Sequence, residues 1–458
     1  SVAIGLWLYL VPATMPPDRF NVAVAEFGVI DAQGRERVTA DSRLIGRTLF
    51  STIQGELEQL PPDYRALTWQ DSMSFLQKRA TIGAIAGLTP AERWPNACKR
   101  ATELGADLIV YGVLDQREQP ALLRLELCAR SRNRERDFGN LDELQRVDRL
   151  GGPLPVTLPL DDVQASVNPP LRVRTSLVAK LVVGLRYELA SNPDYQSSLR
   201  QALTTFSGAL NYLESETGAA TGENGGDIVQ YFIGREHFLL YQDPATPASD
   251  RPARLEAALV AFARAVELNP GFARARNALG SVYFLQAQQV VIGQRHSAPQ
   301  LQQALDAYSA AIPLAQAADD RSAEAEARLS LALTYRLRAE AALFQTPSDP
   351  AAAKADLARA DQEAGAGEAL IQPEQNRFQG FAAMVRGLIA HQQAQIRLRA
   401  NDQAAARELF AQARDAYTRC IAAGQADPGD QYLKRQIIAF TCTPRQASVA
   451  AALQRIGQ

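Results

Sequence analysis

The chain has 458 residues, enough for two or three domains with a substantial core. Its 48 lysines and arginines are balanced by 50 aspartates and glutamates, so no overall positive field exists to attract nucleic acid. The three histidines are far apart, and the four cysteines contain no Cys-x-x-Cys pair. Histidines and cysteines at these spacings form no cluster of metal ligands, so we expect no metal site. Because the charges balance, we also expect no nucleic-acid partner.

Residues 2–11 form an uninterrupted apolar run, which a proline-rich stretch follows. A spanning helix needs about twenty such residues, so we expect 1–17 to be the end of a membrane-anchor helix, truncated at its start, and a linker. A cleaved secretory signal would not leave its apolar core behind; a helix buried on the domain is the other alternative. Few positive charges follow the run, which favours an extracytoplasmic location over the cytoplasmic face.

The segment 18–150 alternates the patterns of strands and helices, and 151–171 is expected to be a linker or an edge strand. The expected elements are a strand at 20–28, a helix at 42–60, a strand at 65–69, a helix at 90–104, and strands at 106–114 and 121–130. This order predicts an α/β sandwich-like domain in which helices cover a sheet.

Two short segments of this domain resemble the amino-terminal domain of TolB-like proteins and the related core of CsgG-type secretion lipoproteins. They are Val22-Ala23-Val24-Ala25-Glu26-Phe27 and Leu104-Gly105-Ala106-Asp107-Leu108-Ile109-Val110-Tyr111-Gly112. The resemblance covers about residues 20–131 and implies an envelope-associated, non-catalytic module for assembly or protein contacts. Neither pore-forming strands nor a propeller is evident downstream, so a secretion function does not follow.

A triplet with the spacing +0, +4 and +7 recurs over residues 172–440, and this spacing places its members on one helix face. The triplets are Ala202/Phe206/Ala209, Ala258/Phe262/Ala265, Ala304/Tyr308/Ala311, Ala353/Leu357/Ala360 and Ala406/Phe410/Ala413. Small residues precede them at Gly184, Gly234, Gly280, Ala332 and Gly387. Each unit is therefore expected to be a helical hairpin, and hairpins of this kind must stack to bury their apolar faces.

This pattern resembles tetratricopeptide repeats, most clearly where the second triplet is followed by Glu267-Leu268-Asn269-Pro270. The resemblance implies an all-α solenoid of about five hairpins at 172–440, with 441–458 as a tail; an irregular helical bundle is the alternative. We therefore expect an α+β protein overall, the sandwich-like domain preceding the solenoid.

Motifs of catalysis are missing from the sequence. It has no phosphate-binding Gly-x-x-x-x-Gly-Lys-Ser/Thr loop, no His-Glu-x-x-His helix and no Gly-x-Ser-x-Gly elbow. The glycine-rich segment 222–227 follows a helix and is expected to be a turn, and the arginines of 117–136 alternate with acids as on a solvated hairpin. We expect no catalytic residue and no cofactor, although a hydrolase built on the α/β region is a distant alternative.

The cysteines leave two possibilities open. Cys420 and Cys442 could pair across the last hairpin in an oxidising compartment. Alternatively, all four cysteines are small buried apolar residues.

Each hairpin is longer than the unadorned motif, so one edge of the solenoid is a candidate for lateral contact, with neutral loop drift as the alternative. The concave face is a candidate peptide groove, for which the first helices of the middle repeats offer Arg274, Asn277, Phe284 and Arg336. Their alternative role is that of ordinary solvent-facing residues.

These patterns together predict a membrane-tethered, non-catalytic scaffold that binds proteins or peptides. Surplus apolar residues at 432–440 also allow a homo-oligomer. The alternative is the sensor or regulatory region of a larger signalling enzyme whose catalytic domain precedes residue 1.

Overall fold

The fold is taken from a computed structural model, which describes residues 14–17, 19–70, 82–130, 144–147, 150–160, 168–189, 194–292, 298–344, 348–373, 375–427, 430 and 433–456. Most of the expected membrane anchor, residues 1–13, lies outside these ranges. Among the described residues, no helix is both long and apolar enough to span a bilayer. The chain divides into two compact units, with described residues up to Asn269 in the first and those from Pro270 onward in the second.

The first unit contains a mixed sheet with the expected strands and helices, except that the strand expected at 20–28 ends at Val24 and a separate strand begins at Gly28. Its strands are β1 (Phe20–Val24), β2 (Gly28–Ile30), β3 (Glu36–Arg37), β4 (Ala66–Gln70), β5 (Leu108–Asp115), β6 (Ala121–Arg130), β7 (Leu144–Val147) and β8 (Leu154–Val156). β5 pairs in parallel with β1 and β2, β1 pairs in parallel with β4, and β6 pairs antiparallel with β5, β7 and β8. The segment after residue 150 thus supplies an edge strand, β8, which is one of the two roles expected for it.

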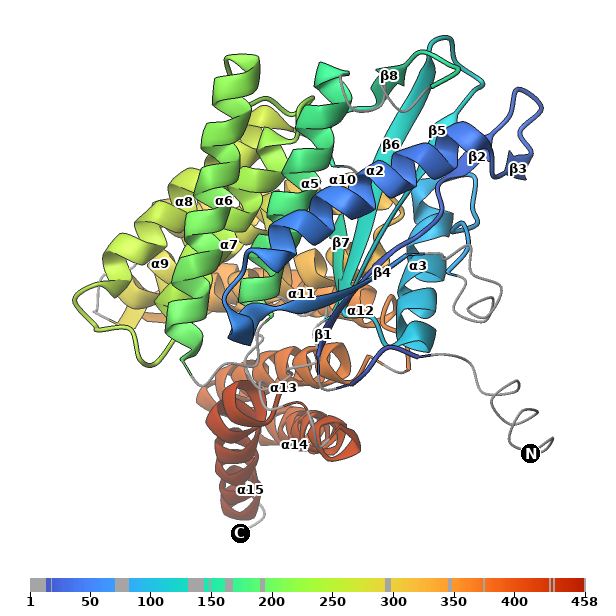
Figure 1. Cartoon of the computed structure of the whole chain (residues 1–458). Coiled ribbons are helices and arrows are strands. Elements are labelled where there is room, and N and C mark those ends of the chain that lie inside the picture. The colour runs from blue at the N-terminus through green and yellow to red at the C-terminus, as the bar shows by residue number, and fades with distance from the viewer. Residues whose placement is uncertain are drawn as a thin grey trace, which may run out of the picture. The chain divides into compact units, whose positions relative to one another are not determined.

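Two helices flank the sheet (Figure 1): α2 (Ala40–Glu58) and α3 (Pro90–Leu104). α3 begins where Thr89 caps the amide of Glu92 and ends at Gly105 in the left-handed conformation. Its apolar face packs on alternate strand residues, including Ala23, Ile109 and Tyr111. Because strand side chains alternate between faces, α2 covers the opposite side, where Phe27 lies against Gly46.

Four further helices complete the first unit as two hairpins, α5 (Pro169–Glu188) with α6 (Tyr195–Thr217), and α7 (Gly226–Gln242) with α8 (Arg251–Leu268). α5 packs against α2 as well as α6, and most of its residues are buried. Arg186 of α5 lies over the rings of Phe20 and Tyr64 and donates to the backbone carbonyls of Asp63 and Tyr64 at 3.0 Å each. The first hairpin is therefore joined to the sheet through both apolar and polar contacts.

The second unit is helical throughout its described residues. Its hairpins are α9 (Ala273–Ile292) with α10 (Ala298–Ala317), α11 (Arg321–Phe344) with α12 (Pro350–Glu368), and α13 (Asn376–Arg399) with α14 (Gln403–Ala426). A π-helix, η3 (Leu433–Cys442), leads into α15 (Thr443–Ile456), which packs against α14. The expected tail after residue 440 is thus helical as far as Ile456.

All fifteen residues of the five triplets are buried, with exposed fractions of at most 2%. A Cβ added to Gly184, Gly234 or Gly280 would collide with the ring of its own triplet, at Phe206, Phe262 and Tyr308. The fifth hairpin differs, because Gly387 faces Tyr417 instead of the expected Phe410. The contact there has moved two turns along α14, so the register of this hairpin is corrected to Ala413/Tyr417/Cys420.

The extra length of the hairpins lies largely in their helices, which contain 17 to 24 residues. A loop at 243–250 joins α7 to α8. The corresponding residues 345–347 lie outside the described part of the chain. Both units together form an α+β protein in which helix predominates.

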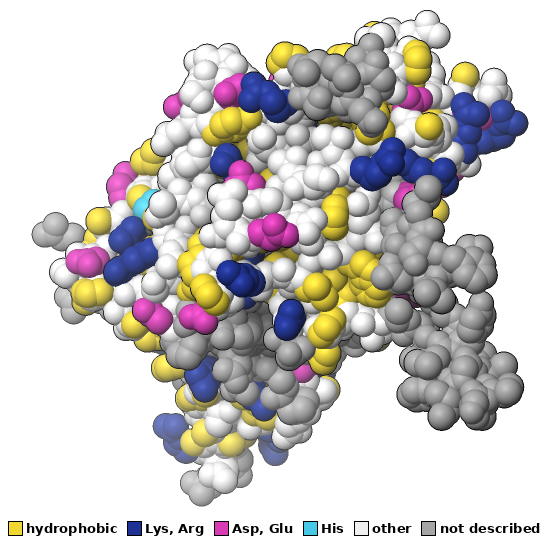
Figure 2. Space-filling view, in the orientation of Figure 1, with side chains coloured by type: hydrophobic (Ala, Val, Ile, Leu, Met, Phe, Trp, Pro, Cys, Tyr) yellow, Lys and Arg dark blue, Asp and Glu magenta, His cyan; other side chains and the backbone are white. Residues whose placement is uncertain are grey.

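Acidic and basic side chains are interspersed over the visible face of the molecule (Figure 2). Arginines gather around the β2–β3 end of the sheet, where Arg35 pairs with Asp31 at 2.9 Å and Arg117 pairs with Asp115 at 2.6 Å. The acid neighbours neutralise these charges. The Arg117–Asp115 pair agrees with the solvated hairpin expected at 117–136, of which residues 131–136 lie outside the described part of the chain.

Candidate functional site

A pocket of about 60 Å³ lies between α11 and α13 in the second unit, with α15 at its margin. We call it the α11–α13 pocket. α11 contributes Arg336, Glu340, Leu343 and Phe344. α13 contributes Leu388, His391, Gln392, Gln395, Ile396 and Arg399, and α15 contributes Arg445. The spacing of three or four residues along each helix turns these side chains toward one another.

Hydrogen bonds fix the polar side chains at the base of the pocket. Arg336 Nη2 donates to Glu340 Oε2 at 2.8 Å, and Arg336 Nη1 approaches Gln392 Oε1 at 3.5 Å. The ring nitrogen Nε2 of His391 lies 3.2 Å from Gln395 Nε2. One helical turn separates each of the two pairs within a helix, so the backbone itself holds Arg336 against Glu340 and His391 against Gln395.

Several polar atoms here have no hydrogen-bond partner among the described residues. They are Arg336 Nε, His391 Nδ1, Gln392 Nε2 and, behind the pocket, the hydroxyl of Tyr417. His391 is 5% exposed and Gln392 is 7% exposed, so solvent reaches them poorly. A buried donor without a partner costs roughly 1–3 kcal/mol. An acceptor that enters the pocket would relieve this cost.

The electrostatics of the pocket favour an anion. Arg336, Arg399 and Arg445 stand against a single acid, Glu340. Burial, followed by the charges of Arg445 and Arg336, lowers the pKa of His391 to about 4, so its imidazole is neutral at pH 7. Burial also lowers the pKa of Arg336. Positive charge is thus already close enough to suppress a further positive charge on the histidine.

Of the four residues expected on the concave face, only Arg336 lines this pocket. Arg274 is buried and donates to both carboxylate oxygens of Asp320, at 2.8 and 3.1 Å. Asn277 is buried and donates to the carbonyl of Ala323 at 2.9 Å. Phe284 is half-buried and packs on Leu301 and its neighbours. These three residues join α9 to neighbouring helices of the second unit, and the structure does not bring them together with Arg336.

The sequence analysis overlooked His391, Gln392 and Arg445. The repeat of polar residues along 391–399 is a signal for the first two, since it interrupts the apolar pattern of a packed helix. No sequence pattern marks Arg445, because α15 comes close to α13 only in the folded chain.

A second polar cluster is buried in the first unit. Glu188 of α5 accepts from Arg235 Nε at 2.9 Å, while Glu236 is fully buried beside it. Burial, followed by the charge of Glu188, raises the pKa of Glu236 well above its ordinary value. The neutral carboxylic acid can then donate to Glu188. No group of metal-ligating residues occurs in the described part of the chain.

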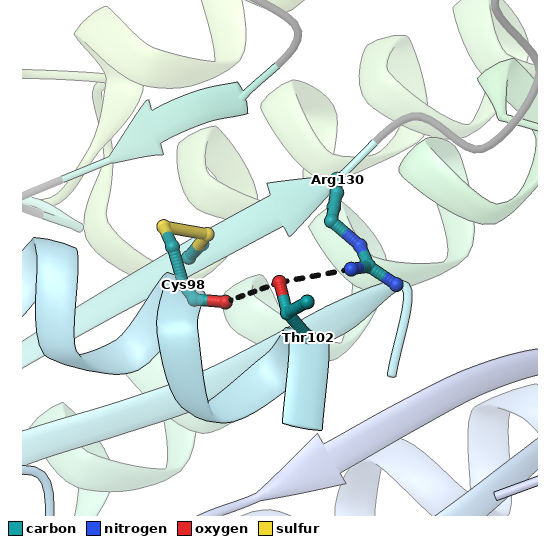
Figure 3. Close-up of a disulfide and its surroundings, with 4 residues drawn as sticks. Cys98, Thr102 and Arg130 are labelled. Atoms are coloured by element: carbon teal, nitrogen blue, oxygen red, sulfur yellow. Dashed lines mark hydrogen bonds between the residues drawn. A yellow bond between two sulfur atoms is a disulfide. The ribbon is translucent and has the colours of Figure 1, made fainter. Parts of the chain in front are cut away.

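All four cysteines are paired, in the bonds Cys98–Cys128 and Cys420–Cys442. The second bond is the one that the sequence suggested, and the first was not predicted. Cys98–Cys128 joins α3 to β6, beside a chain of hydrogen bonds in which Arg130 donates to Thr102 and Thr102 donates to the carbonyl of Cys98, each at 2.9 Å (Figure 3). The alternative of four unpaired buried cysteines is therefore wrong.

No protein-family model matches the chain, and a search of curated proteins found no match either.

Proposed function

We propose that this protein is a non-catalytic scaffold that binds proteins or peptides through a solenoid of the tetratricopeptide type. The observation that carries the proposal is the contact between a glycine of the first helix and a ring of the second, found in four of the five hairpins at Gly184, Gly234, Gly280 and Gly387. The fourth hairpin has Ala332 in place of the glycine. Contacts of this kind let paired helices approach closely. Their recurrence supports a repeat over an irregular bundle.

The first helices of the second unit support a shared binding face. α11 contacts α9 on one side and α13 on the other, in addition to its own partner α12. Successive first helices that touch in this way line one surface of a solenoid. The α11–α13 pocket opens between two of them, so it belongs to the surface that we propose for partners.

We propose that the α/β part serves as an assembly module of the TolB-like kind and that the chain is tethered to a membrane by its amino-terminal apolar run. Two disulfides favour an oxidising compartment, because cytosolic thiols are kept reduced. This agrees with the scarcity of positive charge after residue 11 and supports an extracytoplasmic location for the described residues.

A sensor region of a larger signalling enzyme is the second candidate. The small volume of the α11–α13 pocket favours it, since 60 Å³ accommodates a single chemical group instead of a peptide segment. A kinase or another catalytic domain in the complete gene product would favour sensing over scaffolding.

Native purification of the full-length protein in mild detergent, with mass spectrometry of the proteins retained, tests the scaffold. We expect a defined partner or a uniform homo-oligomer, and we expect charge reversal at both Arg399 and Arg445 to weaken partner retention. Arg414→Glu on the exposed side of α14 is the matched control. A monomer without partners, or retention unchanged by the double reversal, would contradict the proposed use of this face.

A further inference from the structure

We propose that the α11–α13 pocket binds one oxyanion group, a carboxylate or a phosphate monoester, carried on an apolar moiety. This inference rests on the proposed function in that it names the chemical class recognised at the partner surface. It concerns the pocket alone, so binding can be measured without any partner.

Two hydrogen-bond donors in the lining of the pocket have no acceptor among the described residues. Nε of Arg336 and Nε2 of Gln392 are buried nitrogens that can only donate, and neither has a partner among the described residues. Their side chains are already oriented, because Arg336 is held by Glu340 and by Gln392. Both nitrogens are closed to solvent, so an oxygen atom accepts from them once a small movement of either side chain opens the way.

His391 can contribute a third donor. In the neutral imidazole one nitrogen accepts while the other donates, and the amide nitrogen of Gln395 lies at Nε2. The accepting role therefore falls to Nε2 and the proton to Nδ1, which has no partner in the described structure. A cation would meet this proton and three arginines, so the site selects against positive ligands.

Charge and size narrow the class further. Arg399 and Arg445 are exposed at the margin, where they can attract an anion before it enters. The volume of about 60 Å³ suits a carboxylate or a phosphate group and little more. The remainder of the ligand must stay at the mouth, where the 61%-exposed Phe344 provides an apolar surface. Leu343 and Leu388 also line the pocket but are half-buried. An oxyanion on an aliphatic or aromatic group fits both parts.

Calorimetric titration of the full chain at constant ionic strength tests the proposal. The probes are acetate, 3-methylbutanoate, inorganic phosphate and phenyl phosphate, with chloride as the reference anion. We expect at least one oxyanion series to bind, and the member with the apolar group to bind roughly tenfold more tightly than its parent ion. A response to the carboxylates alone or to the phosphates alone identifies which oxyanion the pocket takes.

Two variants connect the binding to the pocket. We expect Arg445→Gln to weaken binding roughly 10- to 100-fold, because a charged partner of the anion is lost. Arg445 is exposed, so this substitution should leave the fold intact. Arg336→Gln should weaken binding to the same extent, with circular dichroism as the check on its fold, whereas Arg414→Gln should bind as the wild type does. The proposal is overturned if no probe binds more tightly than chloride, or if Arg445→Gln binds as well as the wild type. If the wild type binds an oxyanion but retains no partner and forms no homo-oligomer, that result contradicts only the scaffold.

Discussion

The contact between Gly234 of α7 and Phe262 of α8 gives the sharpest prediction on stability. A Cβ at residue 234 would lie 2.7 Å from two atoms of the Phe262 ring. The ring cannot move aside easily, because Tyr231 and Phe238 surround it at centroid distances of 5.8 and 6.5 Å. Overpacking of this kind costs roughly 1–3 kcal/mol, and the better helix propensity of alanine returns about 1 kcal/mol. We therefore expect Gly234→Ala to destabilise the first unit by up to about 2 kcal/mol.

The matched control is Gly208→Ala in α6, where a Cβ would meet nothing within 4 Å. This change should stabilise the unit by up to about 1 kcal/mol. Urea denaturation followed by circular dichroism measures both changes, and hydrogen exchange localises the effect to α7 and α8. Gly234→Ala combined with Phe262→Leu should recover part of the loss, because leucine relieves the collision. If Gly234→Ala is as stable as Gly208→Ala, the close approach of the two helices is refuted.

Three further changes should alter stability. Glu236 has a raised pKa, so the folded state keeps a proton that the unfolded state releases above the ordinary pKa of 4.5. The free energy of unfolding of the wild type should therefore fall as pH rises from 4.5 toward the pKa of the folded state. Glu236→Gln should flatten this dependence, which denaturation at a series of pH values measures. Replacing both Cys420 and Cys442 with alanine opens a loop with a sequence separation of 22. This change should lower the free energy of unfolding by about 3 kcal/mol, as measured by urea denaturation, and should also weaken oxyanion binding at the pocket. Asp430→Asn should lower the free energy of unfolding by roughly 3–5 kcal/mol, because Arg377 is 2% exposed and would lose its partner carboxylate at 2.7 Å. A lower midpoint of thermal unfolding would report this loss.

Exposed counterparts provide the controls for these changes. Glu256→Gln on α8 should leave the pH dependence intact, and Asp415→Asn on α14 should leave the free energy of unfolding within about 0.5 kcal/mol of that of the wild type. An unchanged pH profile in Glu236→Gln would show that the carboxyl group is ionised in the folded protein. Thiols that react with alkylating agent in the native, unreduced protein would contradict the disulfides.

The repeat pattern was readable from the sequence because helical packing imposes a strict local period. Ala258, Phe262 and Ala265 share a face whatever the rest of the chain does. The strands were readable for the same reason, since β1 and β5 are short apolar runs between turn residues. The register of the fifth hairpin was not, because Phe410 and Tyr417 lie on the same face of α14 and local spacing cannot decide which of them meets Gly387.

The α11–α13 pocket could not be predicted in full, since it needs three helices to converge. Arg336, Arg274 and Asn277 were all identified by their place on a first helix, so their spacing could not show which of them lines the pocket. Their partners Asp320 and Ala323 lie 46 positions along the chain from each of them, so only the fold reveals that they are already engaged. Cys98–Cys128 was hidden in the same way, because the bond depends on the docking of α3 against β6.

The position of α5 also governs how the chain can be shortened for study. Its residues are buried on nearly all sides, against α2 on one side and α6 on the other. A fragment that starts near residue 172 would lose most of the first turn of α5 and all of α2, and would expose Leu177, Val178 and Leu181 to water. The α/β part thus covers the apolar face of the first hairpin, as a terminal cap would in the repeat array that we propose. Truncations that retain residues 20–188 with the hairpins should remain soluble, whereas the repeats expressed alone should aggregate.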